Sequence, residues 1–339
     1  NTLKELKLPQ ETRDEALNEI GQKRWQNAHT LAFFKGKDLL WRYDLNCELP
    51  VVDLARGRVE ARWGRPYVAP LLYALDEYER AAVLWIGEKW RIFEVFLGEI
   101  EEADAVFRTV APEDWQRLNR YDRAVAETVA EPRDYCDRDR FARRMEAWAS
   151  RFLKLFAHLV EHALAEREIS RLVLLGREEA TKDFEQYLSR TMRSRIVAHV
   201  NDLPSPGAPP AMVLKKVAPV LEAVERNEEQ RLLDAIESQP GVTGLDAVLG
   251  ALQHGLLLVV AVPWSLEARV WRCAHNWAGA SPEAVRALCP GDTPVEVPLR
   301  DVIVDVAADF GARLEFVRGD AEARLIRDFG GLAGLKRWK

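Results

Sequence analysis

The chain has 339 residues, which predicts two or three domains because a single hydrophobic core stops growing at about 250–300 residues. Its 48% hydrophobic and 30% charged residues are those of an ordinary globular protein, and the absence of any run of about 20 apolar residues argues against a membrane span. A formal net charge of −6 excludes binding to nucleic acid by overall charge, so any RNA contact must come from a local basic patch.

The four cysteines are scattered over the sequence, which predicts no disulfide framework. The first residues are charged and carry no signal-peptide pattern. We therefore expect a protein of the reducing cytoplasm.

Residues 1–68 are predicted to form a small β-rich N-terminal domain. Helical spacing covers Thr12–Gln26, and strand patterns bounded by glycines follow at Asn27–Phe34, Asp38–Leu45 and Val59–Trp63.

Residues 69–203 are predicted to form a central domain that opens with a helix and a β-hairpin. Pro70 suits a first helical turn, and the apolar residues behind it have helical spacing. Ala81–Ile86 and Trp90–Phe96 have strand patterns joined at Gly87. Because both faces of the second strand are mostly apolar, we expect the sheet to be covered on both sides.

The rest of the central domain alternates helices and strands. We predict a long helix over Asp139–Ala165, a strand at Arg171–Leu175, a helix at Arg177–Leu188 and a strand at Arg195–Val200. A hairpin followed by this alternation is typical of an α/β domain with a mixed sheet.

Residues 204–339 are predicted to form a third, α/β domain after the proline-rich linker Leu203–Ala211. Its predicted helices are Met212–Ser238, Leu245–Gln253 and Leu299–Phe310, and its predicted strands are Leu256–Val262 and Arg313–Val317. The segment between them reads as a loop-like insertion.

The long helix carries an apolar seam and many arginines. The seam has steps of three and four residues and consists of Phe141, Met145, Trp148, Phe152, Leu155, Leu159 and His162. The arginines lie off the seam or before it, and acidic residues are interleaved with them. Their pattern alone leaves two interpretations open, a solvated mixed-charge face and an RNA-contacting face.

Two segments resemble the bacterial branch of the archaeo-eukaryotic release factor and Pelota superfamily. They are the helix and hairpin within Gly64–Glu102, and the run DRDRFARRMEAW at Asp137–Trp148. The resemblance implies an RNase H-like central domain and an L7Ae-like α/β/α C-terminal domain. It also implies binding to the ribosomal A site and peptidyl-transferase centre, with contact to ribosomal RNA through Arg133, Tyr135, Arg138, Arg140, Arg143, Arg144 and Arg151.

The catalytic Gly-Gly-Gln loop of release factors is absent. Its place is occupied by Pro132–Asp137, and no glycine occurs between Gly98 and Gly176. The resemblance therefore implies a Balon-like factor that acts in ribosome hibernation or rescue without hydrolysing peptidyl-tRNA and without a cofactor. A translational GTPase is a further expected partner. Binding to a membrane or to DNA is not expected. The alternatives are a peptidyl-tRNA hydrolase that acts as a rescue release factor and a non-ribosomal α/β protein.

Possible metal ligands are few. Cys273, His275 and Cys289 resemble a degenerate zinc ribbon without a fourth ligand, so we expect no metal there. His158 and His162 are one helical turn apart, but His162 falls on the apolar seam and is predicted to be a core histidine.

Overall fold

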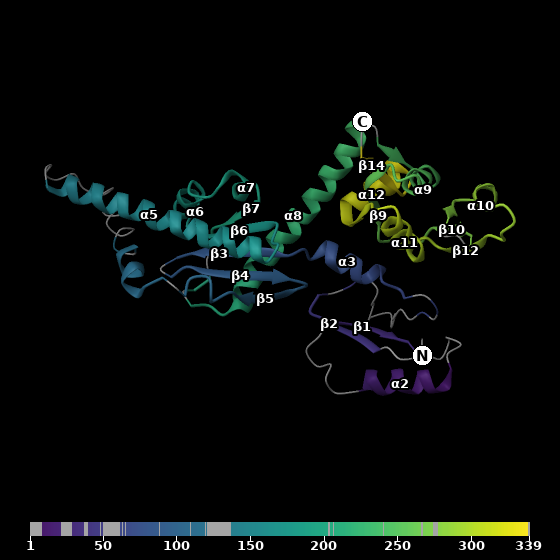
Figure 1. The fold of residues 1–339 in the computed structure, drawn as a ribbon, viewed down its shortest axis with the longest axis horizontal. Coiled ribbons are helices and arrows are strands. Elements are labelled where there is room, and N and C mark those ends of the chain that lie inside the picture. The colour runs from purple at the N-terminus through teal and green to yellow at the C-terminus, as the bar shows by residue number, and fades with distance from the viewer. Residues whose placement is uncertain are drawn as a thin grey trace. The chain divides into compact units, whose positions relative to one another are not determined.

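The computed structural model describes residues 9–21, 29–36, 40–47, 49, 62, 64, 66–87, 89–108, 110–118, 120, 137–202, 204–205, 207–239, 241–265, 267–273 and 277–337. They form a mixed α/β protein with several sheets, as the sequence predicts (Figure 1). The chain divides into two compact units, residues 80–221 and residues 1–79 with 222–339. The division into domains 1–68, 69–203 and 204–339 stays a prediction. No helix in the described part of the chain is long and apolar enough to span a membrane.

The unit 80–221 is built on a five-stranded mixed sheet. Its strand order is β5 (Glu99–Glu102), β4 (Arg91–Phe96), β3 (Ala81–Ile86), β6 (Arg171–Gly176) and β7 (Ile196–Val200). The strands β3, β6 and β7 are parallel to one another, whereas β3, β4 and β5 are joined antiparallel. This confirms the predicted hairpin and mixed sheet, and β5 is a strand that the sequence analysis missed.

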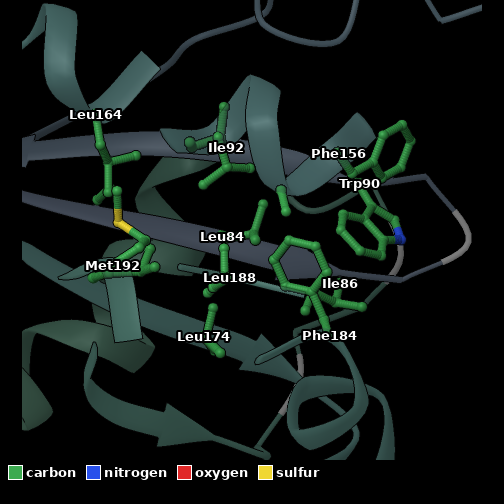
Figure 2. Close-up of a cluster of buried hydrophobic side chains, with 14 of the residues drawn as sticks. Leu84, Ile86, Trp90, Ile92, Phe156, Leu164, Leu174, Phe184, Leu188 and Met192 are labelled. Carbon is green, nitrogen blue, oxygen red and sulfur yellow. The ribbon is translucent and has the colours of Figure 1, made fainter. Parts of the chain in front are cut away.

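Both faces of this sheet are covered, because alternate residues of β3 enter two different cores. Ala82, Leu84 and Ile86 face the helices α5 (Asp137–Glu166), α6 (Glu178–Glu185) and α7 (Arg190–Arg193). Figure 2 shows the cluster of leucines and aromatic rings on this side. Val83 and Trp85 enter the core on the other side, which includes Val213 and Val217 of α8 (Pro210–Ser238). The predicted two-sided cover of the hairpin is therefore confirmed.

The other unit contains a four-stranded sheet in the order β13 (Arg313–Val317), β9 (Leu257–Pro263), β14 (Ala333–Lys336) and β8 (Val242–Thr243). The helices of this part are α9 (Leu245–Gln253), the short helix η2 (Leu299–Asp301), α11 (Ile303–Asp309) and α12 (Gly319–Phe329). The predicted helix over Leu299–Phe310 is thus a 3-10 turn followed by an α-helix. The sequence analysis missed α12, β8 and β14.

Two glycine-bearing turns of this unit lie against each other. The Gly244 N–H lies 2.8 Å from the Phe329 carbonyl oxygen and 2.9 Å from that of Leu332. Gly330 ends α12 at φ 70°, and a Cβ there would lie 3.4 Å from the Cα of Gly244. Close approach of the two backbones and a left-handed helix end explain these glycines without a ligand.

A small lobe replaces the predicted loop-like insertion. Its three-stranded antiparallel sheet has the order β11 (Ala278–Gly279), β10 (Arg269–Arg272) and β12 (Val295–Pro298), and α10 (Pro282–Leu288) packs on it.

Further elements of the same unit precede the central hairpin. They are α2 (Gln10–Gly21), the antiparallel pair β1 (Thr30–Lys35) and β2 (Leu40–Leu45), and α3 (Ala69–Glu77). Of the predicted strand at residues 59–63 the structure describes only residue 62, which is not part of a strand.

Buried ion pairs join α3 to α8 in this unit. The Glu77 carboxylate, whose side chain is 5% exposed, pairs with Arg226 and, at 3.3 Å, with Arg318. Arg226 also pairs with the fully buried Glu229 at 2.9 Å. Burial raises the pKa of Glu229 to about 8, although the Arg226 guanidinium opposes this shift.

A second buried carboxyl, that of Asp76, lies at the end of α3. It accepts the Phe316 N–H at 2.6 Å. Burial, and then the nearby Glu315 carboxylate, raise the pKa of Asp76 to about 8. This unit thus contains two carboxyls whose pKa burial raises well above the usual range.

Candidate RNA interface on the long helix

Aromatic side chains hold α5 across the sheet. The ring of Phe156, fully buried, meets Trp90 of the hairpin at a centroid distance of 4.7 Å and Phe152 of its own helix at 4.4 Å. Trp115 closes the cluster at 4.8 Å from Phe156. Figure 2 shows Phe156 beside Trp90 at one end of this core. Because these rings fix the rotation of α5 about its own axis, they decide which of its side chains face solvent.

The outer face of α5 carries positive and protonatable side chains. Exposed residues recur there at steps of three, four or eight positions, namely Arg143, Arg151, Lys154, His158 and His162. At 100° per residue they lie opposite the buried line Ala149, Phe152, Phe156, Val160 and Ala163. This row of exposed side chains, here called the stripe, extends over about 28 Å at 1.5 Å per residue. A helix face of this kind presents a row of donors and positive charges to a phosphate backbone.

Among the seam positions whose side chains are described, the buried face differs from the prediction at two; the side chains of Phe141 and Met145 lie outside the described residues. Leu155 is 49% exposed, and the side chain of His162 is 62% exposed and lies 3.5 Å from Glu166. The prediction of a core histidine is therefore wrong. The seam was assigned with an average step of 3.5 residues, whereas an α-helix has 3.6 residues per turn. After Phe152 the buried line continues with a step of four residues to Phe156 and not with a step of three to Leu155.

Two of the three acidic residues on or near this face of α5 have partners of their own. Glu161 accepts the backbone N–H of Ser189, the N-cap residue of α7, at 2.7 Å, and Glu166 pairs with His162. Glu146 is exposed near the other end. The stripe thus combines three positively charged side chains and two imidazoles with three carboxylates, of which Glu161 and Glu166 are already bonded to Ser189 and His162.

The predicted RNA-binding residues fall into three groups. Arg143 and Arg151 are exposed on α5, and the Arg151 Nε donates to the Ala147 carbonyl oxygen at 3.1 Å. Arg138, Arg140 and Arg144 belong to α5, and only their backbone is described. Arg133 and Tyr135, with the whole segment 121–136 where a catalytic loop would lie, are outside the described residues.

The predicted RNA-binding set did not include the C-terminal half of this exposed face. Lys154, His158 and His162 lie on the same face as Arg143 and Arg151, but only the arginines were assigned to RNA. The spacing of 143, 147, 151, 154, 158 and 162 was visible in the sequence. It was hidden because an apolar seam had been drawn through His162.

The predicted metal-ligand set contains a correction. Cys273 and Cys289 form a disulfide with a Cα–Cα distance of 6.5 Å, a single bond that the expectation of no disulfide framework did not include. They are brought together because Cys273 follows β10 and Cys289 ends α10, a contact that their separation of 16 residues does not disclose. His275 lies outside the described residues. Within the described ranges, one group of three potential metal ligands has its ligand atoms within 4.8 Å of one another, and it consists of Cys273, Cys289 and Asp292.

Cys47 is also buried in the described part of the chain, and it is unpaired. Burial raises the pKa of the Cys47 thiol to about 11. This thiol is therefore protonated and unreactive at neutral pH.

A known family model matches the segment of the chain that contains the five-stranded sheet and α5. Residues 66–222 match the bacterial archaeo-eukaryotic release factor family 10. No curated protein matches the chain.

Solved structures with a similar arrangement include two Pelota proteins and a yeast factor. The chain is similar to Archaeoglobus fulgidus Pelota at 16% identity over 77% of this chain and 64% of that one, with a TM-score of 0.30. It is similar to archaeal Pelota in a model with the ribosome and ABCE1 at 13% identity, over 82% and 68%, with a TM-score of 0.44. It is similar to S. cerevisiae Dom34, described as a termination-like factor that interacts with Hbs1, at 10% identity, over 81% and 69%, with a TM-score of 0.42. The chain thus spans slightly less than two thirds of the Archaeoglobus protein.

Proposed function

Through residues 66–222 the chain belongs to the bacterial branch of the archaeo-eukaryotic release factor superfamily, and from this premise we propose that it is a ribosome-associated translation factor. The observation that carries the proposal is the stripe on α5, since it lies within the matched segment and is formed by the helix that follows the catalytic-loop position. A local stripe reconciles RNA binding with a net charge of −6. It supplies phosphate contacts without requiring a basic protein overall.

The finer role that we propose is occupation of the A site in hibernation or rescue, in the cytoplasm, without peptide release. The absence of any glycine between Gly98 and Gly176 supports this role. A Gly-Gly-Gln loop needs the backbone freedom of its two glycines to hold a water beside the peptidyl ester. In this proposal Arg143 and Arg151 contact ribosomal RNA, and the segment 121–136 approaches the peptidyl-transferase centre.

Sedimentation tests the proposal. Purified protein is mixed with bacterial ribosomes from growing and from starved cells, and each mixture is centrifuged at low and at raised salt. We expect the protein to sediment with ribosomes at low salt, and more of it with ribosomes from starved cells. If it stays at the top of the gradient at low salt, where phosphate contacts are strongest, the proposal is wrong.

A release assay separates this role from the hydrolase alternative. Stalled ribosome–nascent chain complexes are incubated with the protein, and free peptide is measured. We expect none above the buffer control. Peptide release that disappears in the Tyr135→Ala and Arg138→Ala variants would show a hydrolase instead.

A further inference from the structure

The segment around α7 is basic in a protein whose net charge is −6. No aspartate or glutamate occurs between Glu185 and Asp202, whereas three arginines and one histidine do. The side chains of Arg190 and Arg193 are exposed. Among the residues that the structure describes, neither of these two guanidinium groups has an acidic partner. Both positive charges are therefore available to a ligand.

The other two basic side chains of this segment are already engaged. The Arg195 guanidinium donates to the Ile169 carbonyl oxygen at 2.9 Å, and the His199 ring lies 3.3 Å from the Glu185 carboxylate. Arg195 thus ties the chain after α7 to the residues that follow α5. Only the two arginines of α7 itself are left for a contact outside the protein.

A shared cap fixes α7 on α5. The Ser189 hydroxyl accepts the Met192 N–H at 3.2 Å, which is one half of a capping box. The other half is usually a glutamate at the third helical position, which accepts the N–H of the capping residue, but Met192 occupies that position here. Glu161 of α5 accepts the Ser189 N–H instead, at 2.7 Å. Met192 and Leu164 of α5 also belong to one core cluster (Figure 2).

This cap places α7 beside the C-terminal half of the stripe. Lys154 precedes Glu161 by seven residues, so it lies about 10 Å away along the axis of α5 and within about 20° around it. His158 lies between them, about one turn before Glu161. Since Arg190 directly follows Ser189, the exposed surface at Lys154 and His158 continues onto α7.

The charge balance shows why α7 matters for an RNA contact. On α5 alone, the three cations of the stripe, leaving its imidazoles aside, face three carboxylates, so the stripe has no excess of positive charge. The helix α7 adds two guanidinium groups and no carboxylate. A guanidinium group can bind two phosphate oxygens at once. The surface of both helices together is therefore complementary to a phosphate backbone.

We propose that Arg190 and Arg193 of α7, together with Lys154 of α5, form a second phosphate-binding part of the candidate interface and hold the backbone of ribosomal RNA. Glu161 is a positioning residue, because it holds α7 in place and does not itself contact the RNA. This inference rests on the proposed function, which supplies the ribosome as the partner. It goes further because it extends the interface from one helix to two and assigns its excess charge to α7.

The double variant Arg190→Gln, Arg193→Gln tests the second part of the interface. Both side chains are exposed, so the unfolding midpoint should be unchanged. Ribosome binding by the full-length protein is measured by sedimentation over a series of salt concentrations. We expect the affinity at low salt to fall roughly tenfold or more and the slope of log K against log salt to become shallower by about 1.4–1.8. Affinity and slope equal to those of the unchanged protein would overturn this inference and leave the ribosomal role intact.

A matched control removes the same charge elsewhere. In the double variant Lys182→Gln, Arg327→Gln both substituted side chains are exposed but paired, Lys182 with Glu178 at 2.6 Å and Arg327 with Asp328 at 2.8 Å. We expect this protein to bind ribosomes like the unchanged one, because neither cation is available to a phosphate. An equal loss of affinity in the control would mean that net charge, and not α7, determines binding.

Two substitutions at Glu161 test its positioning role. Both Glu161→Gln and Glu161→Ala remove the negative charge, but only the glutamine can still accept the Ser189 N–H. We expect Glu161→Ala to bind ribosomes several-fold more weakly than Glu161→Gln, and the amides of α7 to exchange hydrogen faster in the alanine variant alone. Equal affinities of the two variants would show that Glu161 does not position the arginines.

A short labelled RNA duplex identifies the kind of partner. Phosphate contacts carry no sequence information, so the full-length protein should bind the duplex at low salt, and Arg190→Gln with Arg193→Gln should weaken this binding. Ribosome binding that needs the two arginines, without any binding of the duplex, would place a ribosomal protein on this surface and contradict the RNA contact. If the unchanged protein binds neither ribosomes nor the duplex, the proposed function and this inference fail together.

Discussion

The rings of Trp90 and Phe156 meet edge to face at a centroid distance of 4.7 Å, and this contact sets the orientation of α5 on the sheet. It joins the end of the hairpin to the middle of the long helix. Through it, the core of the unit determines that Arg151 and Lys154 face outward. The candidate RNA interface is thus a consequence of how the aromatic cluster packs.

Two neighbouring residues of α5 provide a direct check of this orientation. Phe156→Ala should lower the free energy of unfolding by about 3–5 kcal/mol, because it removes a fully buried ring and leaves a cavity. Leu155→Ala should change it by less than about 0.5 kcal/mol, since that side chain is 49% exposed. Urea denaturation followed by tryptophan fluorescence measures both. Equal losses would show that α5 is rotated relative to this description.

Two glycines should respond to alanine in opposite directions. A Cβ on Gly241 would lie 2.5 Å from the Ile236 carbonyl oxygen, so Gly241→Ala should cost about 1–3 kcal/mol. A Cβ on Gly250 in the middle of α9 meets nothing within 4 Å, so Gly250→Ala should stabilise by about 0.4–1 kcal/mol. Thermal unfolding of the two variants gives the sign of each change. A stabilised Gly241→Ala protein would contradict the close contact.

The buried Asp76 predicts a specific pH dependence. Its pKa is about 8 in the folded protein and about 3.9 in an unfolded chain, so between these values the folded state binds the extra proton. The stability that this carboxyl contributes is therefore present at low pH and is lost as the pH rises to about 8, by up to about 1.4 kcal/mol per pH unit. Its charged neighbours are Glu315, Glu225 and Arg313.

The Asp76→Asn variant isolates this contribution. The asparagine side chain can still accept the Phe316 N–H but does not titrate. We expect the difference in unfolding free energy between Asp76→Asn and the unchanged protein to favour the variant increasingly between pH 5 and pH 8. Stability curves that stay parallel over this interval would mean that Asp76 is already ionised at pH 5.

Much of the fold could be predicted because local patterns and global packing agree. The strand at Ala81–Ile86, the helix at Leu245–Gln253 and the strand at Arg313–Val317 have the predicted bounds. Each is a continuous apolar or amphipathic run bounded by a turn or cap. The helix α12 was missed because its polar residues dominate its sequence, although Leu325 and Phe329 are buried by the sheet beside it.

The candidate site was predictable only in part. A helix with arginines off its apolar face was visible in the sequence, and so was the missing catalytic loop. The exposure of His162 could not be predicted, because it depends on whether Leu155 or Phe156 packs into the aromatic cluster. The Cys273–Cys289 bond depends on the way β10 and α10 fold back on each other, and no local pattern encodes that contact.

Lysines on the opposite face of the sheet provide the control for the interface. Lys215→Glu with Lys216→Glu on α8 changes the net charge by the same amount as a double reversal on α5. Lys216 pairs with Asp202 at the surface, so its loss should hardly affect stability. This control variant should bind ribosomes like the unchanged protein. A control that loses ribosome binding would show that total charge, rather than the stripe, determines the affinity.

The most direct test of the ribosomal role is the salt dependence of ribosome binding in the Arg143→Glu, Arg151→Glu double variant. Both side chains are exposed, so the fold should be unchanged, as circular dichroism and the unfolding midpoint can verify. Removal of two phosphate contacts should weaken binding steeply at low salt and lower the slope of log K against log salt by about 1.4–1.8. Ribosome affinity and slope equal to those of the unchanged protein would contradict the account and identify the stripe as an ordinary solvated helix face.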